Sequence, residues 1–310
     1  MIATRDAYGE ALAELGAASD TIAVLDADLS GSTRTKAFAK AHPERFFNMG
    51  VAEANMAGTA AGLAAGGMTV FMSSFAMFAA GKAWEQVRQT ICVPNLSVKI
   101  CATHAGLTVG EDGKSHQMLE DVTLMRVLPN MTVIVPADGV EASQAVRAAA
   151  AHDGPVYLRL SRAKTPVVFD DDHRFEIGKG DVLREGTDLA IVACGVELAE
   201  AMGAAELLAA EGIQARVINM ATIKPLDGPL LEAAARECGA ILTAEEHQVA
   251  GGLGSAVAEH LARTCPVPME LCGVQDTFGE SGDATELLAE YGLDAASLAA
   301  RGRELVGRKR

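Results

Sequence analysis

A glutamate and a glycine-rich loop carry the side chains of this sequence that are best suited to chemistry. Glu53 follows the stretch 45–49 and opens a run of small residues, so it is expected where a strand gives way to a helix. A carboxylate at that place gains from the helix dipole alone, which is a purely structural explanation. A buried glutamate with a raised pKa is also well suited to general acid or base catalysis, which is the functional hypothesis.

The loop at 103–117 is the second candidate region, because it holds His104, His116 and two adjacent carboxylates, of which Asp112 is one. Loops at strand ends project polar groups into a crevice, so this combination indicates a binding or catalytic site. Eleven residues separate the two histidines, and no helical i, i+4 pairing relates them. The spacing therefore does not indicate a metal site.

Two phenylalanines stand out in a chain with only 4% aromatic residues. Phe75 and Phe78 lie at i, i+3 where a helix is expected to begin, and could form an aromatic wall for a flat ring, whereas Phe71 is expected in the core. The segment 252–254 has two of the three glycines of a dinucleotide-binding loop, so helix packing explains it better. The sequence has neither a nucleophile elbow nor a Walker loop, which removes support for those hydrolases and for ATP chemistry.

Composition limits the class of protein. The chain has 310 residues, of which 49% are hydrophobic, enough for two packed domains. A formal net charge of -15 argues against binding to nucleic acid or to an anionic membrane. No secretory leader pattern and no apolar run of about 18 residues is seen, so a cytoplasmic location is expected. The six cysteines include no Cys-x-x-Cys pair, which is typical of reduced, structural thiols.

Short apolar strands alternate with helices in the first half of the chain. Strands are expected at 21–25, 45–49, 68–71, 96–102, 132–135 and 156–160, and helices at 7–18, 35–41, 52–66, 76–91, 118–125 and 139–151. This pattern predicts an α/β fold with a doubly wound parallel sheet, in which ligands bind outside the carboxyl ends of the strands. Four polar residues are expected to emerge at that edge: Asp28, Glu53, His104 and Arg162.

The same pattern restarts after residue 186 and predicts a second, smaller α/β domain. Strands are expected at 189–193, 215–219, 240–244 and 268–272, and helices at 196–211, 228–238, 251–264 and from 283 onward. A Pro- and Gly-containing segment interrupts the pattern and indicates a linker that could carry a β-hairpin. The predicted division is residues 1–165, a linker at 166–186, and residues 187–310.

Several linked motifs resemble the transketolase family across nearly all 310 residues. The segments 49–56, 75–81, 110–117 and 136–138 are similar to its pyrimidine-binding domain, in the same order and at comparable spacing. The segments 222–227, 245–247, 251–254 and 276–282 are similar to its C-terminal domain. The resemblance implies transfer of a two-carbon ketol unit from a ketose phosphate to an aldose, with thiamine diphosphate as cofactor.

One family motif is missing. Transketolases hold the diphosphate through a metal bound to a Gly-Asp-Gly motif in an N-terminal domain, and these 310 residues contain no Gly-Asp-Gly. The chain therefore resembles the C-terminal subunit of a split transketolase. The resemblance implies a separate N-terminal subunit that carries Gly-Asp-Gly and holds the Mg²⁺ or Ca²⁺ ion. It also implies an α2β2 heterotetramer, and a chain that by itself binds the cofactor poorly and has no activity.

The resemblance also implies roles for individual residues. Glu53 matches the glutamate that hydrogen-bonds the aminopyrimidine ring of the cofactor. The positions around the cofactor are Asp28, Phe75 and Phe78. The positions that contact sugar hydroxyls and assist proton transfer are His104, Asp112 and His116. The positions that bind the terminal phosphate of the sugar are Arg5, Ser32, His104 and Arg162.

The sequence departs from the family pattern at a few of these positions. Ala54 stands where the family usually has His, Met72 where an aromatic residue is common, and Phe78 where Tyr is common. Two related enzymes remain alternatives: the β subunit of a 2-oxoacid dehydrogenase and a deoxyxylulose-phosphate-synthase-like enzyme. A non-catalytic assembly subunit is an alternative of a different class, against which the retained Glu53 and both histidines argue.

Overall fold

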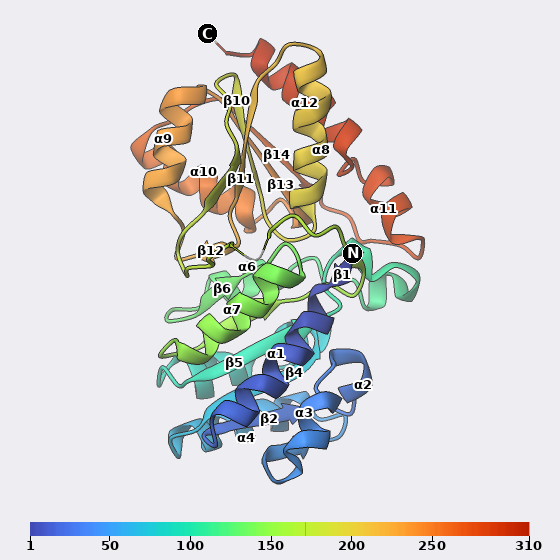
Figure 1. Ribbon diagram of the computed structural model, residues 1–310, viewed down its shortest axis with the longest axis vertical. Coiled ribbons are helices and arrows are strands. Elements are labelled where there is room, and N and C mark those ends of the chain that lie inside the picture. Colours follow the sequence, from blue (N-terminus) through green and yellow to red (C-terminus); the bar gives the residue numbers. More distant parts are fainter. Residues whose placement is uncertain (171, 310) are drawn as a thin grey trace.

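Six strands of the first half pair in parallel, and together with β12 they form the larger sheet of seven strands (Figure 1). The strand order is β12-β6-β7-β5-β4-β2-β3, and only β12 runs antiparallel to its neighbour. Both faces of the central strands are buried, which suits their nearly continuous apolar sequence. The strands are β2 (Ile22–Asp26), β3 (Phe46–Asn48), β4 (Thr69–Phe75), β5 (Val98–Thr103), β6 (Thr132–Ile134), β7 (Val156–Arg159) and β12 (Thr222–Lys224). The computed structural model describes residues 1–170 and 172–309.

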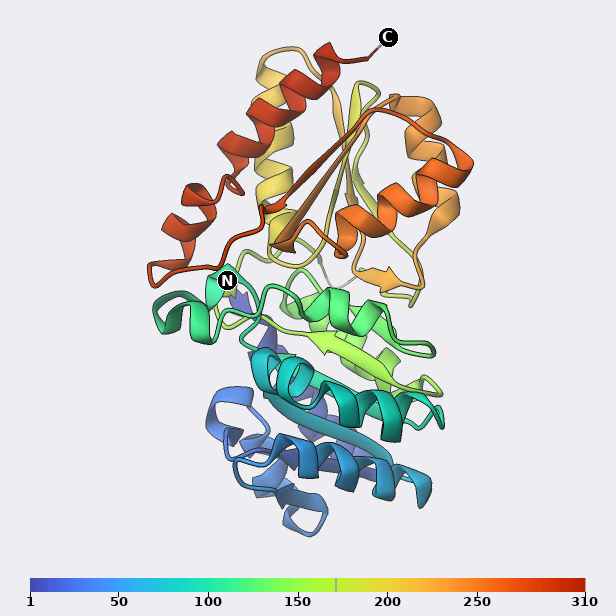
Figure 2. The same cartoon turned by 180° about the vertical axis from the view of Figure 1, so that it is seen from behind.

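Helices cover both faces of this sheet (Figures 1 and 2). Helices α1 and α7 lie on one face, and α4 with two π-helical segments lies on the other. The α-helices are α1 (Thr4–Ala18), α2 (Ser30–Thr33), α3 (Lys36–Ala41), α4 (Glu53–Ala65), α5 (Trp84–Gln86), α6 (Asp121–Arg126) and α7 (Gly139–Ala151). The other helical segments are η1 (Pro43–Arg45), η2 (Met77–Lys82), η3 (Val87–Cys92) and η4 (Leu107–Ser115).

The helix predicted at 76–91 is not a continuous α-helix. Its two ends, η2 and η3, are π-helical and flank the short α5. Apolar periodicity did not reveal this, because a turn widened by one residue leaves the apolar residues on nearly the same face. Segments with π geometry occur often at functional sites, and η2 carries two residues of the site described below.

The second sheet has the order β14-β13-β10-β11-β9, with four parallel strands and the antiparallel edge strand β9. Helices α8 and α12 pack on one side of it and α9 and α10 on the other (Figure 1). Its strands are β9 (Asp181–Arg184), β10 (Leu189–Ala193), β11 (Ala215–Asn219), β13 (Ile241–Gln248) and β14 (Met269–Val274). Its helices are α8 (Glu197–Ala210), α9 (Gly228–Cys238), α10 (Leu253–Thr264), α11 (Ala284–Glu290) and α12 (Ala295–Gly307). The predicted fold class, a doubly wound sheet followed by a smaller α/β domain, is confirmed.

Several short strands pair with segments that are far away in the sequence. Strand β1 (Ile2–Ala3) pairs antiparallel with β8 (Lys164–Thr165), next to the predicted linker. Within the described residues of 166–186 the structure shows one strand, β9, which pairs with β11. The β-hairpin considered for the linker is therefore absent there, since this strand finds its partner in the second sheet. Strand β12, which belongs to the second half of the chain, pairs with β6 at the edge of the first sheet.

Apolar side chains form three buried clusters. One fills the α1–α7 face of the first sheet, one fills the α8–α12 face of the second, and the largest runs from α4 across to α9 and α10. Since one cluster spans both halves, the two domains share a core. All six cysteines are free thiols, as the sequence predicted. No helix of the described residues is long and apolar enough to cross a membrane.

Candidate active site

The carboxyl ends of β2, β3, β4, β5 and β7 meet at one edge of the first sheet, because these strands are parallel and adjacent. The polar residues predicted there follow directly: Asp28 lies two residues after β2, Glu53 five residues after β3, His104 one residue after β5 and Arg162 three residues after β7. The chain topology thus brings the predicted candidates to one rim, as ligand sites in open α/β sheets require.

Glu53 is the first residue of α4 and is almost completely buried, with 2% of its side chain exposed. Its Oε2 atom accepts a hydrogen bond from Lys82 Nζ at 2.6 Å. Within the described residues this is the one hydrogen bond of the carboxylate, and Oε1 makes none. The carboxylate is therefore anchored at one oxygen by a cation while the other remains available for a ligand.

The segment η2 that supplies Lys82 also carries Phe78, which belongs to a cluster of aromatic rings. The ring of Phe75 stacks on the imidazole of His104 at a centroid distance of 3.8 Å. The ring of Phe78 lies 6.1 Å from that of Phe75 at an interplanar angle of 19°, and His116 stands edge-on to both. The structure thus brings together the four rings that the sequence singled out, and Phe71 is core, as predicted.

His104 is held as a neutral imidazole. Its side chain is buried, and burial together with the nearby Arg5 and Arg162 lowers its pKa to about 3. Its Nε2 atom lies 3.1 Å from Arg5 Nη1, and its Nδ1 atom lies 2.9 Å from the hydroxyl of Thr103. Because a guanidinium only donates, Nε2 accepts and the ring proton is on Nδ1.

Cations gather beside this imidazole. Arg5 donates from Nη1 to the backbone oxygen of Ser32 at 3.0 Å, which holds the two residues together. Burial and the charges of Arg34 and Arg162 lower the pKa of Arg5, so these three guanidinium groups lie close enough to repel one another. A local positive site thus exists on a strongly acidic chain, which is what an anionic ligand requires.

Arg162 reaches the loop rather than the aromatic rings. Its Nη1 atom donates to the backbone oxygen of Val109 and to Glu111 Oε2, both at 2.5 Å. Glu111 is 72% exposed, so this ion pair is well solvated and readily exchanged for another anion. Asp112 is exposed on the same loop, and within the described residues its carboxylate has no hydrogen-bond partner.

Asp28 is placed by a tight backbone conformation. Its φ angle is 64°, and it forms a reciprocal pair with Asn48, whose amide donates to Asp28 Oδ1 at 2.9 Å. The neighbouring Asp26 is buried and accepts hydrogen bonds from the backbone of Leu29 and the hydroxyl of Thr33, which orders the loop after β2. Among the described residues, Asp28 makes no hydrogen bond with the aromatic cluster, although both lie at the same rim.

Residues of the second domain form hydrogen bonds with the glycine-rich loop 103–117. Glu246 of β13 accepts from the backbone N–H and the hydroxyl of Thr108, at 3.0 and 2.9 Å. Gly106 makes this approach possible, because a Cβ atom there would lie 2.2 Å from the carboxyl carbon of Glu246, and its φ angle of 84° favours glycine. Gln117 donates to the backbone oxygen of Glu280 at 2.9 Å.

A buried ion network continues this support into the first sheet. Arg159 of β7 donates to Asp121 at 2.8 Å and to Glu246 at 3.3 Å, and all three side chains are at most 5% exposed. Tyr157 adds a hydrogen bond to Asp121 at 2.7 Å. The domain junction is thus tied together by charges that have no access to water.

A second glutamate of β13 explains the paired glycines at 252–254. Glu245 accepts from the backbone N–H groups of Leu253 and Gly254, at 2.7 and 2.8 Å. A Cβ atom on Gly252 would lie 2.1 Å from its carboxylate, so glycine is needed for this close packing at the start of α10. Burial raises the pKa of Glu245 to about 7. The helix-packing explanation given from the sequence is confirmed.

Some residues of the site were missed in the sequence. Lys82 lies 29 residues from Glu53, and Arg34 gave no motif signal of its own. The signal that could have identified Lys82 is its position four residues after Phe78, on the segment that follows the aromatic pair. The Arg159 network gave no such signal, because its members come from β7, α6 and β13.

The fold and the rim define an α/β protein with a ligand site at the carboxyl edge of its larger sheet. The comparisons identify its family. Residues 1–167 match the model of the transketolase pyrimidine binding domain, and residues 178–298 match that of the transketolase C-terminal domain. The chain belongs to the transketolase family and has the domain composition of its split C-terminal subunits. Dependence on thiamine diphosphate follows from that family.

Related proteins of the same length share both domains. The chain is 51% identical over 300 residues to a protein of Methanocaldococcus jannaschii named "Putative transketolase C-terminal section", covering 96% of this chain and 94% of that one. It is 42% identical to a 6-deoxy-6-sulfo-D-fructose transketolase subunit of Clostridium sp. (strain MSTE9), covering 98% and 95% of the two chains.

A solved structure described as "Split gene transketolase, inactive beta4 tetramer" superimposes with a TM-score of 0.92 at 55% identity. It covers 100% of this chain and 99% of that one. Against transketolase from Leishmania mexicana the TM-score is 0.82 at 28% identity, covering 99% of this chain but only 46% of the other. Such full-length transketolases thus contain a further segment that these 310 residues do not match.

Proposed function

We propose that this chain, together with an N-terminal diphosphate-binding subunit, transfers a two-carbon ketol unit from a ketose phosphate to an aldose. The observation that carries the proposal is the buried carboxylate of Glu53, held through Oε2 by Lys82 and free at Oε1, beside a cluster of stacked rings. Thiamine diphosphate supplies the electron sink for breaking the carbon–carbon bond. The residues of this chain bind, orient and move protons around it.

The donor set fits the pyrimidine end of that cofactor. A flat aminopyrimidine needs a carboxylate at its edge and apolar faces around it, and Glu53 with Phe75 and Phe78 provides both. Glu53 Oε1 accepts and returns a proton at a ring nitrogen, and the ammonium group of Lys82 keeps the carboxylate oriented. Asp28 lies beside the cofactor at the end of β2, where the turn after the strand fixes its backbone.

The polar loop and the cations form the sugar site. Neutral His104, with Nε2 as its acceptor, takes a hydrogen bond from a sugar hydroxyl once Arg5 turns toward the anion. His116 and Asp112 complete the contacts to hydroxyl groups and assist proton transfer. Arg5, Arg162 and the hydroxyl of Ser32 bind the terminal phosphate, with Arg162 exchanging the exposed Glu111 for it.

The surface around Glu53 supports a partner chain. Val51 is 74% exposed and Phe47 is 38% exposed, although both lie within six residues of the buried carboxylate. On the outer side of α4, Gly58 and Gly62 face open space, so the backbone of another chain can approach closely there. We infer that the N-terminal subunit, carrying Gly-Asp-Gly and the Mg²⁺ or Ca²⁺ ion, docks at this face in an α2β2 heterotetramer.

The division of the chain follows the same proposal. Residues 1–165 form the pyrimidine-binding domain, 166–186 the linker and 187–310 the C-terminal domain, and the assembly works in the cytoplasm.

No metal ion is assigned to the catalytic residues of this chain, because the candidates there are separate carboxylates and histidines rather than a ligand cluster. The relatives named as transketolases or their subunits favour this activity over the oxoacid dehydrogenase and synthase alternatives.

Reconstitution tests the proposal. The purified chain, a Gly-Asp-Gly-containing N-terminal subunit, and their mixture are assayed for ketol transfer with thiamine diphosphate and Mg²⁺, using phosphorylated donors. We expect activity only in the mixture, and co-elution of the two chains in size-exclusion chromatography. Full activity of this chain alone would refute the split arrangement, and a stable complex that transfers no ketol unit from any donor would leave an assembly role and refute the enzymatic one.

A further inference from the structure

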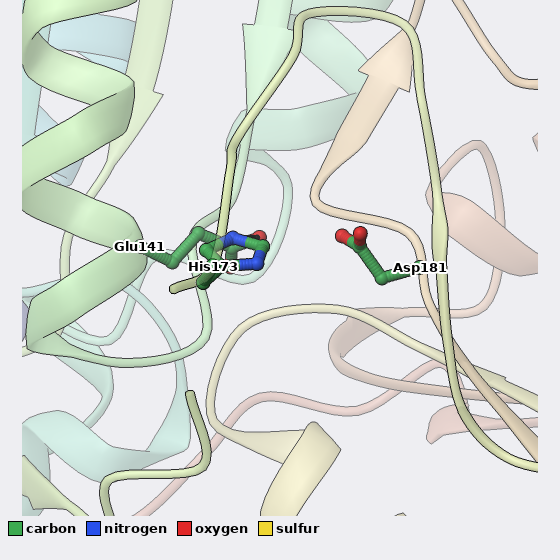
Figure 3. Close-up of side chains that lie close together, drawn as sticks. All are labelled: Glu141, His173 and Asp181. Atoms are coloured by element: carbon green, nitrogen blue, oxygen red, sulfur yellow. Dashed lines mark ion pairs between the residues drawn. The ribbon is translucent and has the colours of Figure 1, made fainter. Parts of the chain in front are cut away.

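A second cluster of ligand-type side chains lies at the domain junction, and none of its members is among the residues proposed to contact the cofactor or the sugar. One carboxylate oxygen of Glu141, one of Asp181 and one imidazole nitrogen of His173 all lie within 4.8 Å of one another (Figure 3). Glu141 comes from the first turn of α7, His173 from the linker and Asp181 from the start of β9. Three different parts of the chain thus converge on one point.

We propose that Glu141, His173 and Asp181 bind one divalent transition-metal ion, zinc or manganese, that fastens the linker and the second domain to the first. The observation that indicates a bound ion is the environment of the His173 imidazole. Its side chain is only 5% exposed, yet Nε2 has no hydrogen-bond partner among residues 1–170 and 172–309. A buried ring nitrogen without a hydrogen bond is unusual, because buried polar atoms normally have a partner.

The spacing of the donors suits a shared ion better than a direct contact. His173 Nε2 lies 3.7 Å from Glu141 Oε1, which is too long for a hydrogen bond. Two ligands at about 2.0 to 2.1 Å from a tetrahedral ion lie about 3.4 Å apart. A contraction of a few tenths of an ångström therefore converts the observed pair into two metal ligands, and Asp181 faces both from the opposite side (Figure 3).

The surroundings hold the ligands in place as metal sites require. The second oxygen of Glu141 accepts from the backbone N–H of Ala137 at 2.7 Å, and Asn219 donates to Oε1 at 2.6 Å. The imidazole of His173 stacks on Phe169 at 3.8 Å. A cavity of about 400 Å³ that His173 and Asp181 help to line gives an ion a path from solvent.

The chemistry of the three donors indicates which ion they suit. Two carboxylates and one imidazole suit zinc or manganese, whereas calcium and magnesium prefer sites made of oxygen alone.

Metal analysis of the full chain tests this site. The chain is stripped with a chelator, titrated with ZnCl₂ or MnCl₂ in a calorimeter, and measured for retained metal after dialysis. The matched variants are His173→Gln and Asp181→Asn, with Asp170→Asn as a control that changes a neighbouring exposed carboxylate of the same cavity. We expect one ion per chain, bound at least about 10-fold more weakly by both ligand variants and normally by the control.

Thermal unfolding gives an independent readout. Added metal should raise the midpoint for the parent chain and for Asp170→Asn, and much less for Asp181→Asn, because only binding to the folded state stabilises it. If His173→Gln fails to fold, Asp181→Asn decides the question, since Asp181 is partly exposed. Absence of retained metal, or binding that neither ligand variant weakens, would overturn the site and leave His173 as a protonated partner of Glu141.

Discussion

The two flanks of the candidate site differ in what holds them. The loop flank, with His104 and Asp112, is supported from behind by Glu246 and the buried Arg159 network of the same chain. On the other flank, the one side-chain hydrogen bond to the Glu53 carboxylate within the described part of the chain comes from Lys82, and the exposed Val51 lies nearby in the sequence. The difference shows that the loop side of the site is held by residues of this chain, whereas the Glu53 side is the one where we propose that the N-terminal subunit docks.

The largest effect is expected at Glu53, the center of the open flank. Glu53→Gln preserves size but removes the carboxylate that exchanges a proton, so the reconstituted enzyme should lose about 10²- to 10⁴-fold in kcat. Steady-state assays at saturating cofactor measure this. Glu85→Gln, an exposed change on α5, is the control and should keep full activity. Near-normal turnover by Glu53→Gln would exclude the proposed role.

Changes in the network that supports the loop flank should lower the stability of the chain and not only its activity. Arg159→Met removes the cation between two buried carboxylates, and leaving them unpaired should lower the free energy of unfolding by about 3 to 5 kcal/mol. Denaturant unfolding of the chain alone measures it. Arg147→Met breaks an exposed pair with Glu14 and should cost no more than about 1 kcal/mol. Equal losses in both variants would remove the junction network from its supporting role.

A smaller and more selective effect is expected at the cationic rim. Arg162→Ala should raise the KM for phosphorylated sugars by about 10-fold, through loss of about 1.4 kcal/mol of charge-assisted binding, and leave kcat nearly unchanged. Parallel assays with phosphorylated and unphosphorylated donors make the comparison. The same increase for both donors would show that Arg162 acts on the loop through Val109 and Glu111 and not on a phosphate.

An effect confined to acidic pH is expected in the stability of the chain. The native pKa of His104 is lowered to about 3 by burial and by the neighbouring arginines, so the unfolded chain binds a proton more readily between about pH 6.5 and 3. Stability from this residue is present above pH 6.5 and is lost as the pH falls. His104→Gln should therefore show a shallower decline of the melting temperature on acidification. An unchanged slope would contradict the neutral, buried imidazole.

The regular elements could be predicted from the sequence because their own residues determine them. Strand β10 and helix α7 occur at the predicted residues, since an apolar run and the N-cap Asp138 mark them locally. Strands β1, β8, β9 and β12 have two to four residues each and form by pairing with distant segments. No local periodicity could reveal them.

The site shows the same division. Glu53 and His104 could be identified by residue type and by their place after strands. Phe75 could be identified by its spacing from Phe78, although it is the last residue of β4, and the structure brings the aromatic residues into contact. Glu246 could not, because its importance depends on which side chain lies opposite it in the folded chain. Lys82 was missed although it follows Phe78 by four residues. The metal-ligand cluster at Glu141 was missed for the same reason, since its three members are 32 and 8 residues apart along the chain.

A direct measurement of cofactor affinity is the simplest test of whether the cofactor site is shared between two subunits. Binding of thiamine diphosphate with Mg²⁺ is followed calorimetrically for this chain alone, for the N-terminal subunit alone and for the complex. We expect at most weak binding, with a Kd of about 1 mM or higher, for the chain alone, and at least about 100-fold tighter binding by the complex, a gain of about 2.7 kcal/mol. Micromolar binding by this chain without its partner would contradict a site shared between two subunits.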